Sequence, residues 1–98
     1  MARREYAVQL AINGRRISKV VIDSHYELRH RQSINDSVVL ELVNLLSGNT
    51  FEPEAESGTF QYFVSDNLIV GSKRYKLVWL LERNELYVGV VNAHRRRR

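Results

Sequence analysis

The stretch that decides the fold reads Ser24-His-Tyr-Glu-Leu-Arg-His-Arg-Gln-Ser-Ile-Asn-Asp-Ser-Val-Val-Leu-Glu-Leu-Val-Asn-Leu-Leu-Ser47. Ser24 and Glu27 form a capping box, which marks the start of a short helix. Asn35 caps a second helix that is apolar nearly all round, which predicts a deeply buried helix ending at Gly48. The first helix carries only one aliphatic residue but two histidines and two arginines, so packing alone explains it poorly.

A β-hairpin is predicted before these helices. Residues 6–12 alternate apolar and polar side chains, which is typical of a strand with one buried face. Asn13-Gly14 is the strongest two-residue hairpin signal, because both positions tolerate positive φ. Residues 15–22 then return as the second strand. Such a turn predicts two cross-strand pairs, Leu10 with Ile17 and Tyr6 with Val21.

Strands dominate the last third of the chain. After a long acidic loop at 47–58, the predicted strands are 59–64, 67–70, 75–81 and 86–93, with turns at 65–67, 71–73 and 82–85. The last strand is apolar on both faces, which indicates a central strand, and Gly89 within it indicates a bulge or a close approach. The order is a β-hairpin, two helices and an antiparallel meander of three to four strands. It predicts an α+β fold with the helices packed on one face of the sheet.

Composition limits the class of protein. The 98 residues fit a single domain, 1–98, with a basic tail at 95–98. There is no cysteine, and no apolar run approaches the roughly 20 residues that cross a bilayer. We therefore expect a soluble, cytoplasmic protein with no membrane partner. A net charge of +4 favours an anionic partner such as nucleic acid, although the arginine tail supplies that excess.

The side chains that can carry chemistry are histidines, arginines, lysines and an asparagine. His25 and His30 diverge by about 140° on a helix, so they form a poor metal pair, and neither a metal nor a cofactor is expected. The set suits metal-independent RNA cleavage, in which histidines transfer protons and cations stabilise the phosphorane. The predicted catalytic residues are His25, Arg29, His30 and His94. The predicted nucleic-acid-binding residues are Arg74, Lys76, Asn92 and Arg95.

Three motifs carry a resemblance to a known family: Ser24-His25-x-x-x-Arg29-His30-x-x-x-Ile34-x-Asp36, Lys73-x-Tyr75-x-Leu77-Val78 and Val90-Val91-Asn92-Ala93-x-Arg95. This pattern resembles the small RelE/ParE-like toxins, especially the BrnT-like branch and the related nucleases of the barnase–EndoU–colicin–RelE fold. The resemblance implies a toxin–antitoxin ribonuclease that a partner antitoxin protein neutralises. It makes His25 and Arg29 the leading site residues, with Arg74 or Lys76 and His94 contributing from the sheet.

Two other interpretations stay open at this point. A non-catalytic nucleic-acid-binding module would use the same cations for phosphates and Tyr62, Tyr75 or Tyr87 for base stacking. A protein-interaction domain would leave the arginine tail solvated and pair the hairpin edge with another chain, for example in a homodimer.

Overall fold

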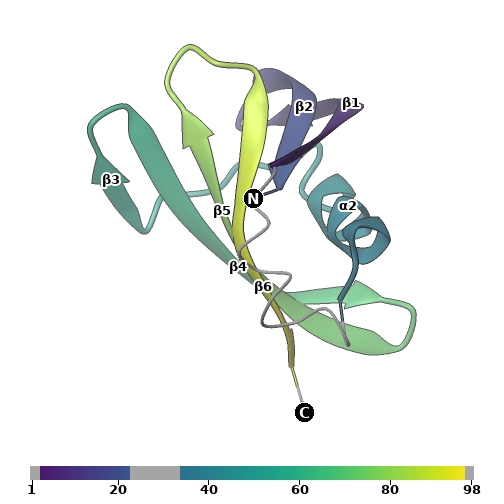
Figure 1. Ribbon diagram of the computed structural model, residues 1–98. Coiled ribbons are helices and arrows are strands. Elements are labelled where there is room, and N and C mark those ends of the chain that lie inside the picture. Colours follow the sequence, from purple (N-terminus) through teal and green to yellow (C-terminus); the bar gives the residue numbers. More distant parts are fainter. Residues whose placement is uncertain (1–2, 23–33, 97–98) are drawn as a thin grey trace.

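The computed structural model of the protein describes residues 3–22 and 34–96, and these form an α+β fold (Figure 1). In the described residues one helix, α2 (Asp36–Asn44), follows the β-hairpin. The strands are β1 (Arg4–Ile12), β2 (Arg15–Ile22), β3 (Ala55–Ser57), β4 (Phe60–Val70), β5 (Lys73–Glu82) and β6 (Tyr87–Arg96). They form one sheet in the order β1-β2-β6-β5-β4-β3. The predicted first helix lies outside the described residues.

The N-terminal hairpin forms as predicted at its turn but shifts register farther along. Asn13 and Gly14 both adopt positive φ, and Leu10 pairs with Ile17 as expected. The predicted pairing of Tyr6 with Val21 is wrong, because Tyr6 pairs with Val20. The register shifts between Ala7 and Leu10, where β1 takes one more residue than β2 to cover the same length.

The sheet is mixed, whereas the sequence predicted antiparallel strands. β2 runs parallel to β6, with Ile22 opposite Val90, while β5 pairs with β6 in the antiparallel sense. β6 therefore lies between β2 and β5, which confirms that it is a central strand. A Cβ atom on Gly89 would lie 2.8 Å from Leu80 Cδ1, so the predicted close approach at this glycine is also confirmed.

Three predicted boundaries in the last half of the chain are wrong. The turn expected at 65–67 is a register shift inside one continuous strand, β4, because Asn67 adopts positive φ without reversing the chain. The loop expected at 47–58 contains β3, which pairs with the beginning of β4. The predicted tail at 95–98 also begins inside β6, which continues to Arg96.

The core lies on the face of the sheet that α2 covers, and we call this face the inner face. Trp79 of β5 is its centre: its ring stacks on Phe63 at 4.1 Å, meets Phe51 edge-on, and its Nε1 donates to Ser65 Oγ at 3.0 Å. In Figure 1, α2 lies between the β1–β2 hairpin and the tip of the β4–β5 hairpin.

α2 is buried on one side only. The Asn35 side chain accepts a hydrogen bond from Val38 N, as its predicted capping role requires. Val39, Leu42 and Val43 are buried, as expected of a deeply buried helix, but Leu45, which caps its C-terminal end, is 43% exposed, so the burial does not extend to every apolar residue. The helix ends at Asn44, and Gly48 follows at positive φ. In the described part of the chain no helix has the length and apolarity to span a bilayer.

Candidate nucleic-acid interface

The predicted site residues on β5 and β6 are sorted by the face of the sheet they occupy. Residues directly opposite each other in an antiparallel pair share a face. Alternate residues of β5 are buried in the core on the inner face: Tyr75, Leu77, Trp79 and Leu81. The residues between them, and their partners on β6, therefore lie on the opposite face, which we call the outer face.

Five polar side chains gather on the outer face at one end of the β5–β6 pair, and we call them the basic cluster: Arg74, Lys76, Asn92, His94 and Arg96. Lys76 lies opposite His94, and Arg74 lies opposite Arg96. Directly opposite residues have Cβ atoms about 5 Å apart, which is close enough for each pair to contact one phosphate group. Lys76 and His94 are half-buried, whereas both arginines are exposed.

The structure brings some predicted residues together and separates others. Arg74, Lys76, Asn92 and His94 share the outer face, and the Asn92 side chain accepts from Ala93 N at 2.9 Å. Arg95 pairs with Tyr75, a core residue, so it projects from the inner face and does not join them.

The three candidates on the predicted first helix, His25, Arg29 and His30, lie outside the described residues. β2 ends at Ile22, opposite Val90 of β6, two positions before Asn92. The first described segment, residues 3–22, therefore ends next to the basic cluster, and the second begins at Ile34.

Arg96 is a member of the basic cluster that the sequence interpretation assigned only to the tail. It lies two positions after His94 on the same strand, so alternation along β6 places both on one face. Its Nη1 lies 2.9 Å from Asp66 Oδ2, an ion pair between half-exposed side chains. Extending the predicted strand past residue 93 would have identified this arginine.

A second polar group, formed by Arg4, Tyr6 and Asp36, ties β1 to the start of α2. Arg4 donates to both oxygens of the Asp36 carboxylate, at 2.5 and 2.8 Å, and the Tyr6 hydroxyl also donates to it. The hydrogen bond to Asp36 raises the pKa of Tyr6 above its usual value. Arg4 is also the cross-strand partner of Ile22. Arg4 therefore connects Ile22 and Asp36, which flank residues 23–33.

An apolar groove of about 330 Å³ lies on the outer face at the other end of β5 and β6. We call it the aromatic groove, and its lining residues are Arg3, Val21, Phe60, Leu80, Tyr87, Gly89, Val90 and Val91. The Tyr87 hydroxyl donates to Glu82 Oε1 at 2.6 Å. Burial, helped by this hydrogen bond, raises the pKa of Tyr87 to about 12, so the phenol is neutral at physiological pH.

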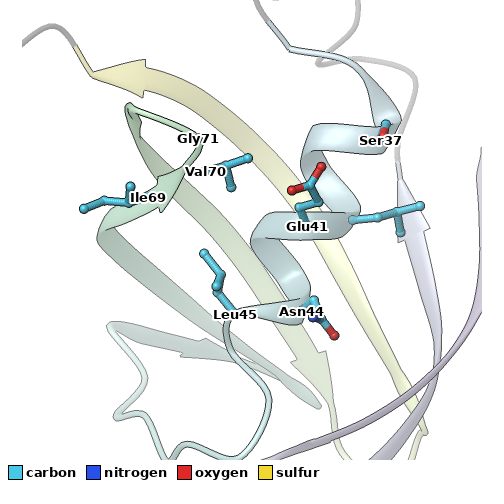
Figure 2. A pocket seen from close by; sticks show the side chains of 8 residues that line it. Ser37, Glu41, Asn44, Leu45, Ile69, Val70 and Gly71 are labelled. Carbon is cyan, nitrogen blue, oxygen red and sulfur yellow. The ribbon is translucent and has the colours of Figure 1, made fainter.

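Figure 2 shows a different groove, between α2 and the tip of the β4–β5 hairpin. Leu45 from the helix and Ile69 from β4 are its most exposed apolar side chains, and Glu41 is its one acidic group. None of the predicted site residues lines it.

Metal ligation and similarity to known proteins give no further assignment. Within residues 3–22 and 34–96, no three His, Cys, Asp or Glu side chains are placed to hold a metal ion together. Comparison of the chain with protein-family models, curated proteins and solved structures found no match.

Proposed function

We propose that this protein binds RNA through the basic cluster and cleaves it without a metal ion. The observation that carries the proposal is the pairing inside the cluster. Arg74 lies directly opposite Arg96, and Lys76 directly opposite His94, on the outer face. Like charges placed directly opposite each other destabilise a sheet. The opposition of Arg74 and Arg96 costs folding free energy; the ion pair of Arg96 with Asp66 offsets part of that cost, and an anion bound between the two strands would offset more of it.

The proposed reaction is an internal transesterification at phosphorus. A base removes the proton of the 2′-hydroxyl, and the 2′-oxygen forms a bond to phosphorus. The bond from phosphorus to the 5′-oxygen then breaks, and an acid protonates that oxygen. The products are a 2′,3′-cyclic phosphate and a free 5′-hydroxyl end.

Roles in this reaction follow from the chemistry of each side chain. Histidine exchanges protons near neutral pH, so His94 is proposed for one of the two transfers. Lys76, on the neighbouring strand, would stabilise the negative charge that develops on the phosphorane oxygens. Arg74 and Arg96 would hold the adjacent phosphate.

Three proposed participants come from the sequence alone. His25, Arg29 and His30 follow the end of β2 by three to eight residues. Because β2 ends next to the basic cluster, a second proton-transfer group from this segment is the simplest addition to His94. We extend the proposal to a toxin-type ribonuclease of the cytoplasm that an antitoxin protein neutralises, which is what the resemblance to RelE/ParE-like toxins implies.

The test is RNA cleavage by the purified protein in the presence of a metal chelator. His94→Ala is expected to slow cleavage by about 10²- to 10⁴-fold, the usual contribution of general acid–base catalysis. Arg95→Ala is the matched control, because it changes the adjacent residue on the opposite face, and its cleavage rate should stay close to that of the wild type. Full activity of the His94→Ala variant would remove His94 from the mechanism.

A second function uses the same cluster without chemistry. Intact RNA that binds the wild-type protein, with affinity that falls steeply as salt rises, would favour a nucleic-acid-binding module. Growth arrest on expression, lost in the His25→Ala variant, would favour the toxin.

A further inference from the structure

The aromatic groove lies on the same face as the basic cluster, but the proposed reaction does not use it. Gly89 on its floor and His94 in the cluster are five positions apart on β6, which is roughly 16 Å along a strand. A short run of nucleotides spans such a distance. The outer face therefore presents an apolar site at one end and a cationic site at the other.

We propose that the aromatic groove binds one nucleobase of a single-stranded RNA whose backbone lies across the basic cluster. This inference rests on the proposed function, because the phosphate-binding groups lie in the cluster. It adds the class of substrate, an RNA with unpaired bases.

The lining of the groove matches the flat apolar surface of a base. Phe60 and Tyr87 provide aromatic rings, and Val21, Leu80 and Val91 provide aliphatic surface around them. Aromatic side chains stack on bases of any sequence, since every base has a π face. Arg3 is 66% exposed in its side chain and adds a guanidinium that can donate hydrogen bonds to a base edge.

The ring of Tyr87 is held in place before any base arrives. Its hydroxyl donates to Glu82 Oε1 at 2.6 Å, and Glu82 lies close enough to Thr59 for its Oε2 to accept at 3.4 Å. A ring fixed in this way loses little freedom on binding, which favours affinity.

Single-stranded RNA fits this groove better than duplex RNA does. Bases in a duplex are stacked on one another and paired across the helix, so none is free to enter a pocket. The groove volume of about 330 Å³ is within the usual range of small-molecule pockets. A base that leaves its stack is the part of RNA that such a pocket accepts.

Gly89 leaves the space that the Leu80 side chain occupies in the lining of the groove. An added Cβ would lie 2.8 Å from Leu80 Cδ1 and 2.9 Å from Leu80 Cγ, so the leucine would have to move. Leu80 also lines the groove, and Gly89→Ala therefore narrows it without changing any charge. This substitution is an independent way to close the site.

The experiment measures the affinity of the full chain for two probes of equal length. One is a 2′-O-methyl oligouridylate, which cannot be cleaved by attack of a 2′-hydroxyl, and the other is its abasic counterpart. Phe60→Ala is expected to weaken binding of the oligouridylate on the order of tenfold and binding of the abasic probe by less than about twofold. Gly89→Ala should give the same pattern. Leu45→Ala, which shortens an exposed apolar side chain on α2, is the control and should bind both probes like the wild type.

Each remaining outcome counts against the inference. Equal losses for both probes would mean that the substitutions act through folding or charge rather than through a base. Unchanged affinity of Phe60→Ala and Gly89→Ala for the oligouridylate would overturn it and leave an apolar protein segment as the occupant. The proposed function is tested separately. If the wild-type protein distinguishes the two probes but never cleaves RNA, base binding in the groove is supported and the proposed nuclease activity is contradicted.

Discussion

The inner and outer faces of the β5–β6 pair are made from alternating residues of the same two strands. Packing of the core explains the residue types on the inner face but not those on the outer face. On the inner face, Leu77 and Trp79 are fully buried, and the indole N–H of Trp79 donates to Ser65. On the outer face, cations lie opposite each other at one end and an apolar groove is open at the other. This difference supports the proposal that the outer face, rather than the inner one, binds a ligand.

The largest expected effect comes from replacing adjacent residues on opposite faces. Trp79→Ala removes the central ring of the core and should lower the free energy of unfolding by about 3–5 kcal/mol. Leu80→Ala, on the outer face, should cost about 1 kcal/mol, because Leu80 is only half-buried. Urea unfolding measures the two free energies. It is followed by tryptophan fluorescence for Leu80→Ala and by circular dichroism for Trp79→Ala, which lacks the tryptophan. Similar losses of unfolding free energy in the two variants would contradict the distinction between a core face and an outer face.

A smaller loss of stability is expected from the polar group that holds β1 against α2. Asp36→Ala removes the carboxylate that accepts from Arg4 and Tyr6, and should lower the free energy of unfolding by about 2 kcal/mol, as expected for hydrogen bonds to a charged group. Lys76→Ala is the comparison on the outer face and should leave stability unchanged or raised, since it removes one positive charge from the basic cluster. Chemical denaturation should therefore show a clear loss of unfolding free energy for Asp36→Ala and little loss, or a gain, for Lys76→Ala.

The next effect concerns the salt dependence of RNA binding. If Arg74 contacts a phosphate, Arg74→Ala should reduce the slope of log affinity against log salt by about 0.7, the value for one phosphate contact on a single strand. Arg95→Ala removes the same charge from the opposite face and should change the slope much less. Titrations at several salt concentrations check this pair, and equal slopes for the two variants would contradict the assignment of the faces.

The last effect should be seen in alkaline solution. The folded state raises the pKa of Tyr87 to about 12, above the value near 10 of an unfolded chain, so folding favours the neutral phenol. This contribution is complete below pH 10 and is lost as the pH rises from 10 towards 12. Tyr87→Phe should therefore lose less stability than the wild type over that interval. Thermal unfolding at a series of pH values measures the difference, and parallel curves would show that Tyr87 does not titrate differently in the two states.

Local sequence signals predicted those parts of the fold that local chemistry decides. Asn13-Gly14 set the hairpin turn, Asn35 capped α2, and alternation along β1 identified its more buried face. The parallel contact of β2 with β6 was missed, because it joins residues about seventy positions apart and no short pattern encodes it. Asn67 was read as a turn because asparagine at positive φ is common in turns, whereas here it lies at a register shift within β4.

The candidate site could be predicted only in its residue types. Histidine, lysine and arginine on the last strands were identified from their chemistry, but their faces depend on the register between β5 and β6. Arg95 was therefore grouped with Asn92 although the two lie on opposite faces, and Arg96 was left in the tail. The aromatic groove combines residues of five separate segments and has no signature in the sequence.

The position of β6 has a consequence for synthesis of the protein. β6 follows every other described strand in the chain but lies between β2 and β5, so β2 has no partner strand on that side until the last strand has emerged from the ribosome. Nascent chains that stop before Tyr87 lack both the strand that joins β2 to β5 and half of the cationic pairs. Such chains cannot complete the six-stranded sheet, so the basic cluster and the aromatic groove are both assembled only after translation of the final strand.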